Sequence, residues 1–114
     1  ILADFTDDYF VDAVPTPFME KVFFIRPHKR DEIPAVTHVD GTGRLHTVTK
    51  EQNEVFYHLI ENFYKITGVP IVLNTSFNLK GEPIVASPND AIRTFFTSGL
   101  DALIIGNYLV DCKI

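Results

Sequence analysis

A short apolar run that gives way at once to a polar run places the strongest restriction on this fold. Residues 70–73, Pro-Ile-Val-Leu, carry no polar side chain, and residues 74–78, Asn-Thr-Ser-Phe-Asn, follow directly. A wholly apolar strand is typical of a sheet that is covered on both faces. Such sheets occur where helices pack on strands. The run therefore predicts an α/β fold in which polar groups follow the end of a buried strand.

The segment before this strand has the pattern of an amphipathic helix. Apolar residues recur at helical spacing over residues 55–66. Thr49 and Gln52 form the pattern of a capping box, so we expect the helix to begin at Thr49. Gly68 suits the C-terminal cap, because glycine adopts positive φ without strain. We expect one face of this helix to pack on the sheet, the face that carries Phe56, Leu59, Ile60 and Phe63.

Upstream of that helix, the sequence predicts strands and turns. Residues 18–25 are rich in β-favouring side chains and predict a strand, and residues 28–32 form a charged loop. Residues 36–39 and 45–48 predict two strands of a hairpin, because the loop between them contains two glycines. Residues 1–17 are expected to be an irregular lead-in, since Pro15 and Pro17 disfavour a helix.

A second helix and a second hairpin are expected towards the end of the chain. Ser87 is a suitable N-cap, Pro88 suits the first helical position, and Gly99 ends the helix. Its buried face is expected to carry Ile92, Phe95 and Phe96. Residues 83–86 predict a short strand, and residues 102–105 and 108–110 predict a hairpin around Gly106-Asn107. We therefore expect one domain of 114 residues, with a mixed twisted sheet and two main helices packed on it.

Composition narrows the classes of function. The formal net charge of −5 disfavours a nucleic-acid partner, since such modules normally carry a basic excess. We expect no membrane segment, because no run has the length and apolarity of a spanning helix. The acidic start is unlike a signal peptide. Cys112 is the one cysteine and cannot form an internal disulfide, so we expect a reducing, cytoplasmic location.

The polar run after the apolar strand is the first candidate binding site. Asn74, Thr75, Ser76 and Asn78 offer hydroxyl and amide groups, which recognise phosphate or carbonyl oxygens without adding charge. Ligands of open α/β sheets bind at the carboxyl ends of strands. The alternative is a turn in which Asn and Ser side chains satisfy their own backbone.

Arg44 is the second candidate, because it follows a glycine-bearing turn. Backbone N–H groups and a guanidinium can converge there on one oxyanion, and the alternative is a solvated arginine on an ordinary hairpin. His38, His46 and Asp40 carry side chains of types that bind metal ions, but nothing in the sequence fixes which way they face, so we expect no metal site. Ser76 lacks a recognisable His base and acid, and we assign no catalytic residue.

These stretches together resemble one protein family. The sequence HVDGTGR at residues 38–44 is followed about thirty residues later by LNTSFN at residues 73–78. This pairing, and the residues around it from position 17 to 110, are similar to the C-terminal, YrdC-like part of O-carbamoyltransferases that modify nodulation factors and antibiotics.

The resemblance implies a two-step activity. The YrdC-like domain forms carbamoyl-adenylate from carbamoyl phosphate and ATP, with Mg²⁺ as the accompanying ion. A larger N-terminal domain of the actin-like ATPase superfamily, which carries the family's metal site, then transfers the carbamoyl group to a substrate hydroxyl. Arg44 and Ser76 match residues that hold carbamoyl phosphate or its adenylate, and Asn74, Thr75 and Thr42 are secondary candidates.

The chain also departs from the family pattern. Gly43 stands where the family has a small residue such as Ala or Ser. A basic stretch expected after Asp4 is missing, either removed or left out as a disordered loop. We therefore expect a fragment of the enzyme that is inactive alone. The alternatives are a non-catalytic phosphate- or nucleotide-binding or docking domain, and a structural domain without a ligand.

Overall fold

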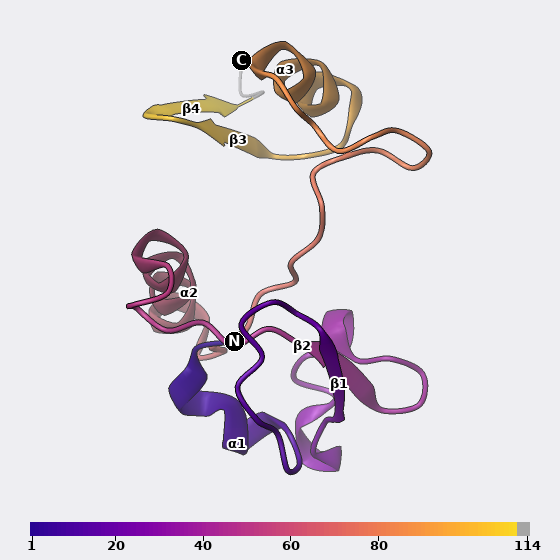
Figure 1. The fold of residues 1–114 in the computed structure, drawn as a ribbon, viewed down its shortest axis with the longest axis vertical. Coiled ribbons are helices and arrows are strands. Elements are labelled where there is room, and N and C mark those ends of the chain that lie inside the picture. Colours follow the sequence, from indigo (N-terminus) through magenta and orange to yellow (C-terminus); the bar gives the residue numbers. More distant parts are fainter. Residues whose placement is uncertain (112–114) are drawn as a thin grey trace. The chain divides into compact units, whose positions relative to one another are not determined.

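The computed structural model describes residues 1–111 and divides into two compact units, the first of residues 1–73 and the second from Asn74 onward (Figure 1). Helices and small antiparallel sheets confirm the α/β class. The strands form two two-stranded sheets, β1 with β2 in the first unit and β3 with β4 in the second. Cys112 lies outside the described residues. None of the helices within residues 1–111 is long and apolar enough to cross a membrane.

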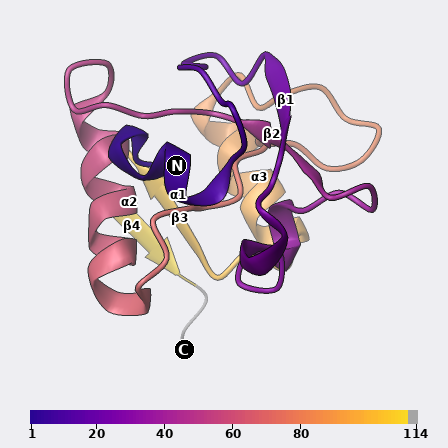
Figure 2. The same ribbon diagram turned by 90° about the horizontal axis from the view of Figure 1, so that it is seen from below.

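The first unit starts with two short helical segments, so the expectation of an irregular lead-in is wrong for residues 3–9. A 3-10 turn at Ala3–Phe5 includes Asp4, and α1 follows at Thr6–Tyr9. Thr6 caps the turn, because its hydroxyl donates to the Ala3 carbonyl at 2.8 Å. These segments lie beside α2 (Glu54–Thr67) in Figures 1 and 2, and the rings of Phe5 and Tyr64 are 4.7 Å apart.

The sheet of the first unit pairs β1 (Lys21–Phe24) with β2 (Thr42–Leu45) in antiparallel register. The expected hairpin between residues 36–39 and 45–48 is therefore wrong. Residues Pro34–Val36 form a 3-10 turn instead, with Pro34 at its first position. Residues 38–42 then form a tight turn, in which the His38 N–H donates to the Thr42 carbonyl at 2.7 Å. The chain becomes extended only at Thr42, where β1 supplies a partner strand.

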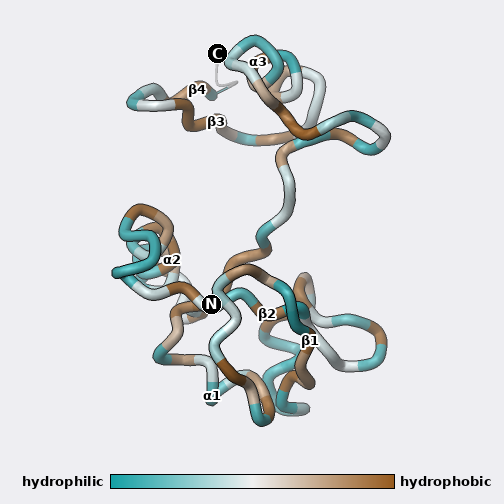
Figure 3. Tube along the Cα trace, viewed as in Figure 1, coloured by the Kyte–Doolittle hydropathy of each residue, from teal (hydrophilic) through white to brown (hydrophobic). Residues whose placement is uncertain are grey.

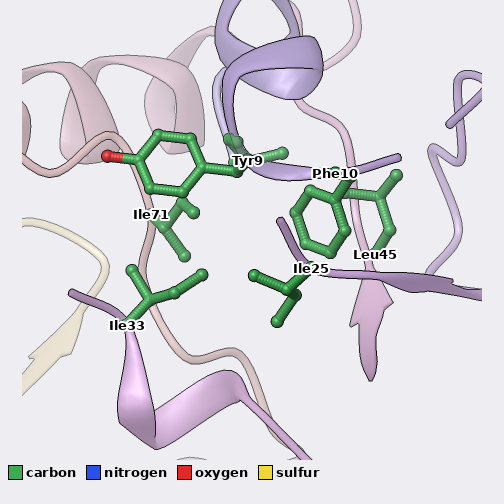
Figure 4. Close-up of a cluster of buried hydrophobic side chains, with 7 residues drawn as sticks. Tyr9, Phe10, Ile25, Ile33, Leu45 and Ile71 are labelled. Atoms are coloured by element: carbon green, nitrogen blue, oxygen red, sulfur yellow. The ribbon is translucent and has the colours of Figure 1, made fainter. Parts of the chain in front are cut away.

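Two clusters of buried side chains hold the first unit together. The larger one gathers residues from α1, β2 and the segments that connect the elements of this unit (Figure 4), namely Ile1, Tyr9, Phe10, Ile25, Ile33, Leu45 and Ile71. The smaller one consists of Leu2, Val48 and Ile60. Full burial of an aliphatic or aromatic side chain stabilises a fold by about 1.5–3 kcal/mol. The strand β2 is thus fixed through Leu45, which is only 1% exposed.

The N-cap of the helix α2 is Asn53, four residues after the N-cap that the capping box predicts. Thr49 and Gln52 do form the box, since each backbone N–H donates to the other side chain, at 3.2 and 3.3 Å. The helix starts at Glu54, however, because Asn53 is extended and its side chain accepts from the Phe56 N–H. The box therefore closes a separate turn. Gly68 confirms the predicted C-cap, with φ of 77° and its N–H bonded to the Tyr64 carbonyl.

The buried face of α2 is narrower than the sequence predicts. Ile60 is fully buried, and Phe56 packs against the smaller cluster. Leu59 and Phe63 are 50% and 40% exposed, so their expected burial on the sheet is wrong. A further apolar side chain, Ile66, is also exposed.

The expected buried strand at residues 70–73 is also wrong. The segment is extended but pairs with none of the strands within residues 1–111, and Figure 3 shows its hydrophobic residues giving way to hydrophilic ones. Pro70 has no N–H to donate, and its carbonyl accepts from the Leu2 N–H at 3.1 Å. Ile71 is buried in the larger cluster, whereas Leu73 is 62% exposed. The run therefore contributes apolar packing rather than a ladder of hydrogen bonds.

In the second unit, the helix α3 (Pro88–Thr97) and the hairpin of β3 (Ala102–Ile105) and β4 (Tyr108–Asp111) are confirmed. The Ser87 hydroxyl oxygen accepts from the Asp90 N–H at 3.2 Å, as expected for an N-cap. Residues 83–86 form no strand. Within residues 74–111, the hydrophobic core of this unit contains Ala91, Phe95 and Leu103. The helix buries fewer apolar side chains than expected, because Ile92 and Phe96 are 42% and 61% exposed.

Candidate functional site

Arg44 lies on the outward face of β2. Side chains alternate along a strand, so Leu45 faces the core while Thr42 and Arg44 share the opposite face. The register places Val22 opposite Arg44 and Phe24 opposite Thr42. Val22 and Phe24 are 52% and 59% exposed, which leaves the face open to solvent around Arg44, whereas Thr42 itself is only 8% exposed. Within the described part of the chain, the Arg44 side chain has neither a hydrogen bond nor an ion pair, so it is available to an anion.

Thr42, beside Arg44 on that face, is the centre of a hydrogen-bonded group. Its hydroxyl and its backbone N–H both donate to Asp40 Oδ1, at 2.7 and 3.0 Å. Nδ1 of His38 lies 2.9 Å from the same hydroxyl oxygen. The hydrogen bonds from Thr42 stabilise the Asp40 carboxylate and lower its pKa. The turn before β2 is thus held by side chains as well as by backbone.

Arg30 is a second cation next to this turn, and the sequence analysis did not single it out. Its Nε donates to the Ile25 carbonyl at 3.2 Å, and its guanidinium packs against Gly41. A Cβ at position 41 would lie 2.4 Å from Arg30 Cζ. The loop that carries Arg30 is fixed by a hydrogen bond from the Tyr9 hydroxyl to Glu32. The charged composition of residues 28–32 indicates that this loop carries cations, but only the fold shows that Arg30 is the one that reaches the turn.

The candidates of the second unit lie in the loop that precedes α3. Asn74, Thr75 and Ser76 are exposed. The Ser76 hydroxyl donates to Asn78 Oδ1 at 2.5 Å, and Asn78 Nδ2 donates to the carbonyls of Leu79 and Glu82, at 3.2 and 3.1 Å. The Asn78 side chain therefore bonds to the backbone of its own loop. This arrangement is the alternative to a binding site that the sequence left open. Ser76 remains accessible to solvent, but its hydroxyl must break the hydrogen bond to Asn78 Oδ1 before it can donate to a ligand.

The two candidate sets occupy different units. Thr42 and Arg44 share one face of β2, and Asn74, Thr75 and Ser76 follow one another in the loop of the second unit. The expectation that Arg44 and Ser76 hold the same anion stays a prediction. His46 packs on the Phe56 ring at 5.7 Å, and burial lowers its pKa. Residues 1–111 contain no group of three or more His, Cys, Asp or Glu side chains placed to hold a metal ion.

Comparison with known proteins assigns the family. The sequence model of the family described as carbamoyltransferase C-terminus matches residues 1–112. The chain belongs to this family. Arg44 and the loop at residues 74–78 are therefore parts of a carbamoyltransferase C-terminus, as the resemblance of their sequences indicates.

Relatives of this carbamoyltransferase C-terminus occur in bacteria and archaea. The chain is 53% identical over 94 residues to nodulation protein NolNO of Sinorhizobium fredii and 50% identical over 94 residues to nodulation protein NolO of Bradyrhizobium diazoefficiens. Each match covers 82% of this chain, but only 14% and 17% of those proteins. An uncharacterized protein of Methanocaldococcus jannaschii is 48% identical over 111 residues, which are 97% of this chain and 22% of that protein. The chain thus spans about a fifth or less of the length of these relatives.

Proposed function

We propose that this chain is the part of an O-carbamoyltransferase that binds carbamoyl phosphate and ATP and forms carbamoyl-adenylate. The α-phosphorus of ATP loses pyrophosphate in this step, and the phosphoryl group of carbamoyl phosphate passes to a water molecule and leaves as inorganic phosphate. A larger domain of the same protein, of the actin-like ATPase superfamily, then transfers the carbamoyl group to a substrate hydroxyl. The membership of the chain in the carbamoyltransferase C-terminus family supports the class of reaction. The observation that carries the assignment of the site is the unpaired, solvent-exposed guanidinium of Arg44 on an open strand face.

In this proposal Arg44 binds the phosphate. Its planar guanidinium offers parallel N–H donors that match two phosphate oxygens. Ser76 contributes a hydroxyl donor to a phosphate or carbamoyl oxygen, and Asn74 and Thr75 line the same loop. The proton of Thr42 is already donated to Asp40. Thr42 therefore supports the turn that presents Arg44, rather than donating to the ligand.

The side chains of the described residues bear on the question of which groups would hold the magnesium ion that accompanies ATP. Mg²⁺ is commonly held by substrate phosphates, waters and one or two carboxylates. The described residues contain no metal-binding cluster. In the proposal, the phosphates of ATP hold the ion, and the described residues contact the phosphates instead.

We expect the 114-residue chain alone to be inactive in this reaction. Phosphoryl chemistry needs several preorganised positive groups around the charge that develops in the transition state. Arg44 is one such group, and in this proposal the other phosphate-binding cations come from parts of the enzyme outside these 114 residues. Loss of one donor lowers a rate by about 10²-fold or more, so the loss of several lowers turnover below detection. Binding is expected to persist at millimolar Kd, about −4 kcal/mol.

The test measures binding and turnover separately. Phosphorus NMR titration of the chain with carbamoyl phosphate should show binding that Arg44→Ala weakens by roughly tenfold, the loss of a charged hydrogen bond of about 1.5 kcal/mol. Lys65→Ala serves as the control, since it removes a positive charge from α2 of the same unit. Pyrophosphate release with ATP, magnesium and carbamoyl phosphate is compared with that of the full-length protein. Equal weakening by both variants would refute the site, and turnover equal to that of the full-length protein would refute the need for the missing segments.

A further inference from the structure

The hydrogen bonds around Thr42 determine which nitrogen of His38 carries the proton in the neutral ring. A threonine hydroxyl has one hydrogen, and Thr42 donates it to Asp40 Oδ1 at 2.7 Å. The contact of 2.9 Å between the hydroxyl oxygen and His38 Nδ1 is then a hydrogen bond only if Nδ1 is the donor. Neutral imidazole has one N–H, so Nε2 is unprotonated and can only accept.

His38 contacts a side chain on the same face of β2 as Arg44. The His38 ring contacts the side chain of Thr42, which shares the outward face of β2 with Arg44. His38 is itself exposed, and Nε2 has no partner in the described part of the chain. A positively charged donor, Arg44, and a neutral acceptor, held by Thr42 two residues away on the strand, thus belong to the same face. The arrangement is complementary to a small ligand with an anionic end and an N–H end.

We propose that His38 is a specificity residue of the carbamoyl phosphate site, in which Nε2 accepts a hydrogen bond from the carbamoyl NH2 group. This inference rests on the proposed function. Carbamoyl phosphate carries both an anionic phosphate and an N–H donor, whereas acetyl phosphate has a methyl group in place of the NH2. A site with an acceptor for a substrate N–H disfavours an analogue that lacks it. Asp40 and Thr42 are positioning residues, because they hold His38 as the acceptor tautomer.

The tautomer can be measured without any ligand. Long-range ¹H–¹⁵N NMR of the chain at pH 8 should show His38 with Nδ1 protonated and Nε2 unprotonated. Thr42→Val removes the hydroxyl at nearly constant shape and should release His38 from this tautomer, whereas Thr42→Ser should keep it. A wild-type His38 that is protonated on Nε2, or that is unaffected by Thr42→Val, would overturn the inference.

The specificity is tested by titration with carbamoyl phosphate, acetyl phosphate and inorganic phosphate. Wild type should bind carbamoyl phosphate about 2–10-fold more tightly than acetyl phosphate, the range expected for one accessible hydrogen bond. His38→Ala should abolish this preference and leave the affinity for acetyl phosphate unchanged. Arg44→Ala should weaken all three ligands. The control is His28→Ala, which removes an exposed histidine from another loop.

The outcomes separate this inference from the proposed function. If wild type prefers carbamoyl phosphate and His38→Ala keeps the preference, the inference is wrong and the proposed function stands. If Arg44→Ala changes no affinity, the proposed site is wrong, and the specificity assigned to His38 fails with it. The inference is supported only if the preference is lost in His38→Ala and in Thr42→Val, and is kept in Thr42→Ser.

Discussion

Replacement of Gly41 by alanine tests how the turn before β2 is built. Gly41 has a φ of 80°, a conformation that is strained for a residue with a Cβ. The new Cβ would also lie 2.4 Å from Cζ of Arg30 and 2.6 Å from its Nη2. The guanidinium is the far end of a flexible side chain, so it can move away, but it then loses the hydrogen bond from Nε to the Ile25 carbonyl.

The expected loss of stability has two parts. Left-handed backbone costs a residue with a Cβ about 1–2 kcal/mol. The hydrogen bond of Arg30 is charge-assisted and partly buried, and its loss costs about 1.5 kcal/mol. Gly41→Ala should therefore lower the free energy of unfolding by about 2–4 kcal/mol. In an Arg30→Ala background the same substitution should cost only the backbone part, about 1–2 kcal/mol.

Urea denaturation followed by tyrosine fluorescence measures both values, since the chain has four tyrosines and no tryptophan. Gly68→Ala is the matched control, because Gly68 has a φ of 77° and nothing lies within 4 Å of the added Cβ. It should show the backbone cost alone. A loss below about 0.5 kcal/mol for Gly41→Ala, or an equal loss with and without Arg30, would refute the packing of Arg30 on this turn.

Three further predictions concern the helices and the turn. Ile60→Ala should lower the free energy of unfolding by about 2–5 kcal/mol, because the side chain is fully buried. Phe63→Ala should lower it by only about 1–2 kcal/mol, because the ring is 40% exposed. Equal losses for the two variants in urea denaturation would contradict the orientation of α2. Thr42→Val should raise the pKa of Asp40 towards its ordinary value in a ¹³C NMR titration. An unchanged pKa of Asp40 in this variant would exclude Thr42 as the cause of the shift. Because the pKa of Asp40 is lowered in the folded state, its contribution to stability is present above the ordinary aspartate pKa and is lost as the pH falls through the lowered pKa. Ser87→Ala should destabilise α3 by about 1 kcal/mol, and a thermal melt by circular dichroism that matches wild type would show the cap to be dispensable.

Structural features that depend on one residue and its near neighbours were predicted correctly from the sequence. Gly68 ends α2, Ser87 caps α3, and Gly106 turns between β3 and β4 with a φ of 57°. Each depends on the conformation of one residue and on a bond to a near neighbour. The start of α2 was missed because Thr49 and Asn53 both carry N-cap signals, and only one can begin the helix. A capping box therefore predicts a turn more securely than it predicts a helix.

The errors in strand pairing have a different cause. Residues 70–73 have the composition of a buried strand, but they pair with none of the strands that the structure describes, and composition alone does not supply a partner. Residues 42–45 pair with residues 21–24, which lie outside the expected hairpin. The contact between Arg30 and Gly41 was missed for the same reason, since it joins a loop to a turn that the chain reaches only after folding. Arg44 and Thr42 could be proposed from their motif, whereas the tautomer of His38 requires the positions of three side chains.

The two units differ in how much core supports them, and this difference has a consequence for dynamics. Among the residues that the structure describes, buried clusters of seven and three residues stabilise the first unit, whereas one cluster of three, Ala91, Phe95 and Leu103, stabilises the second. Regions with fewer buried apolar side chains open at lower free energy. Amide hydrogens of β3 and β4 should therefore exchange with solvent before those of β1 and β2. Ser76 belongs to the second unit. A ligand that binds its loop only in the closed, folded state should therefore reduce the local opening of this unit. Part of the binding free energy then appears as slower amide exchange in β3 and β4, far from the bound atoms.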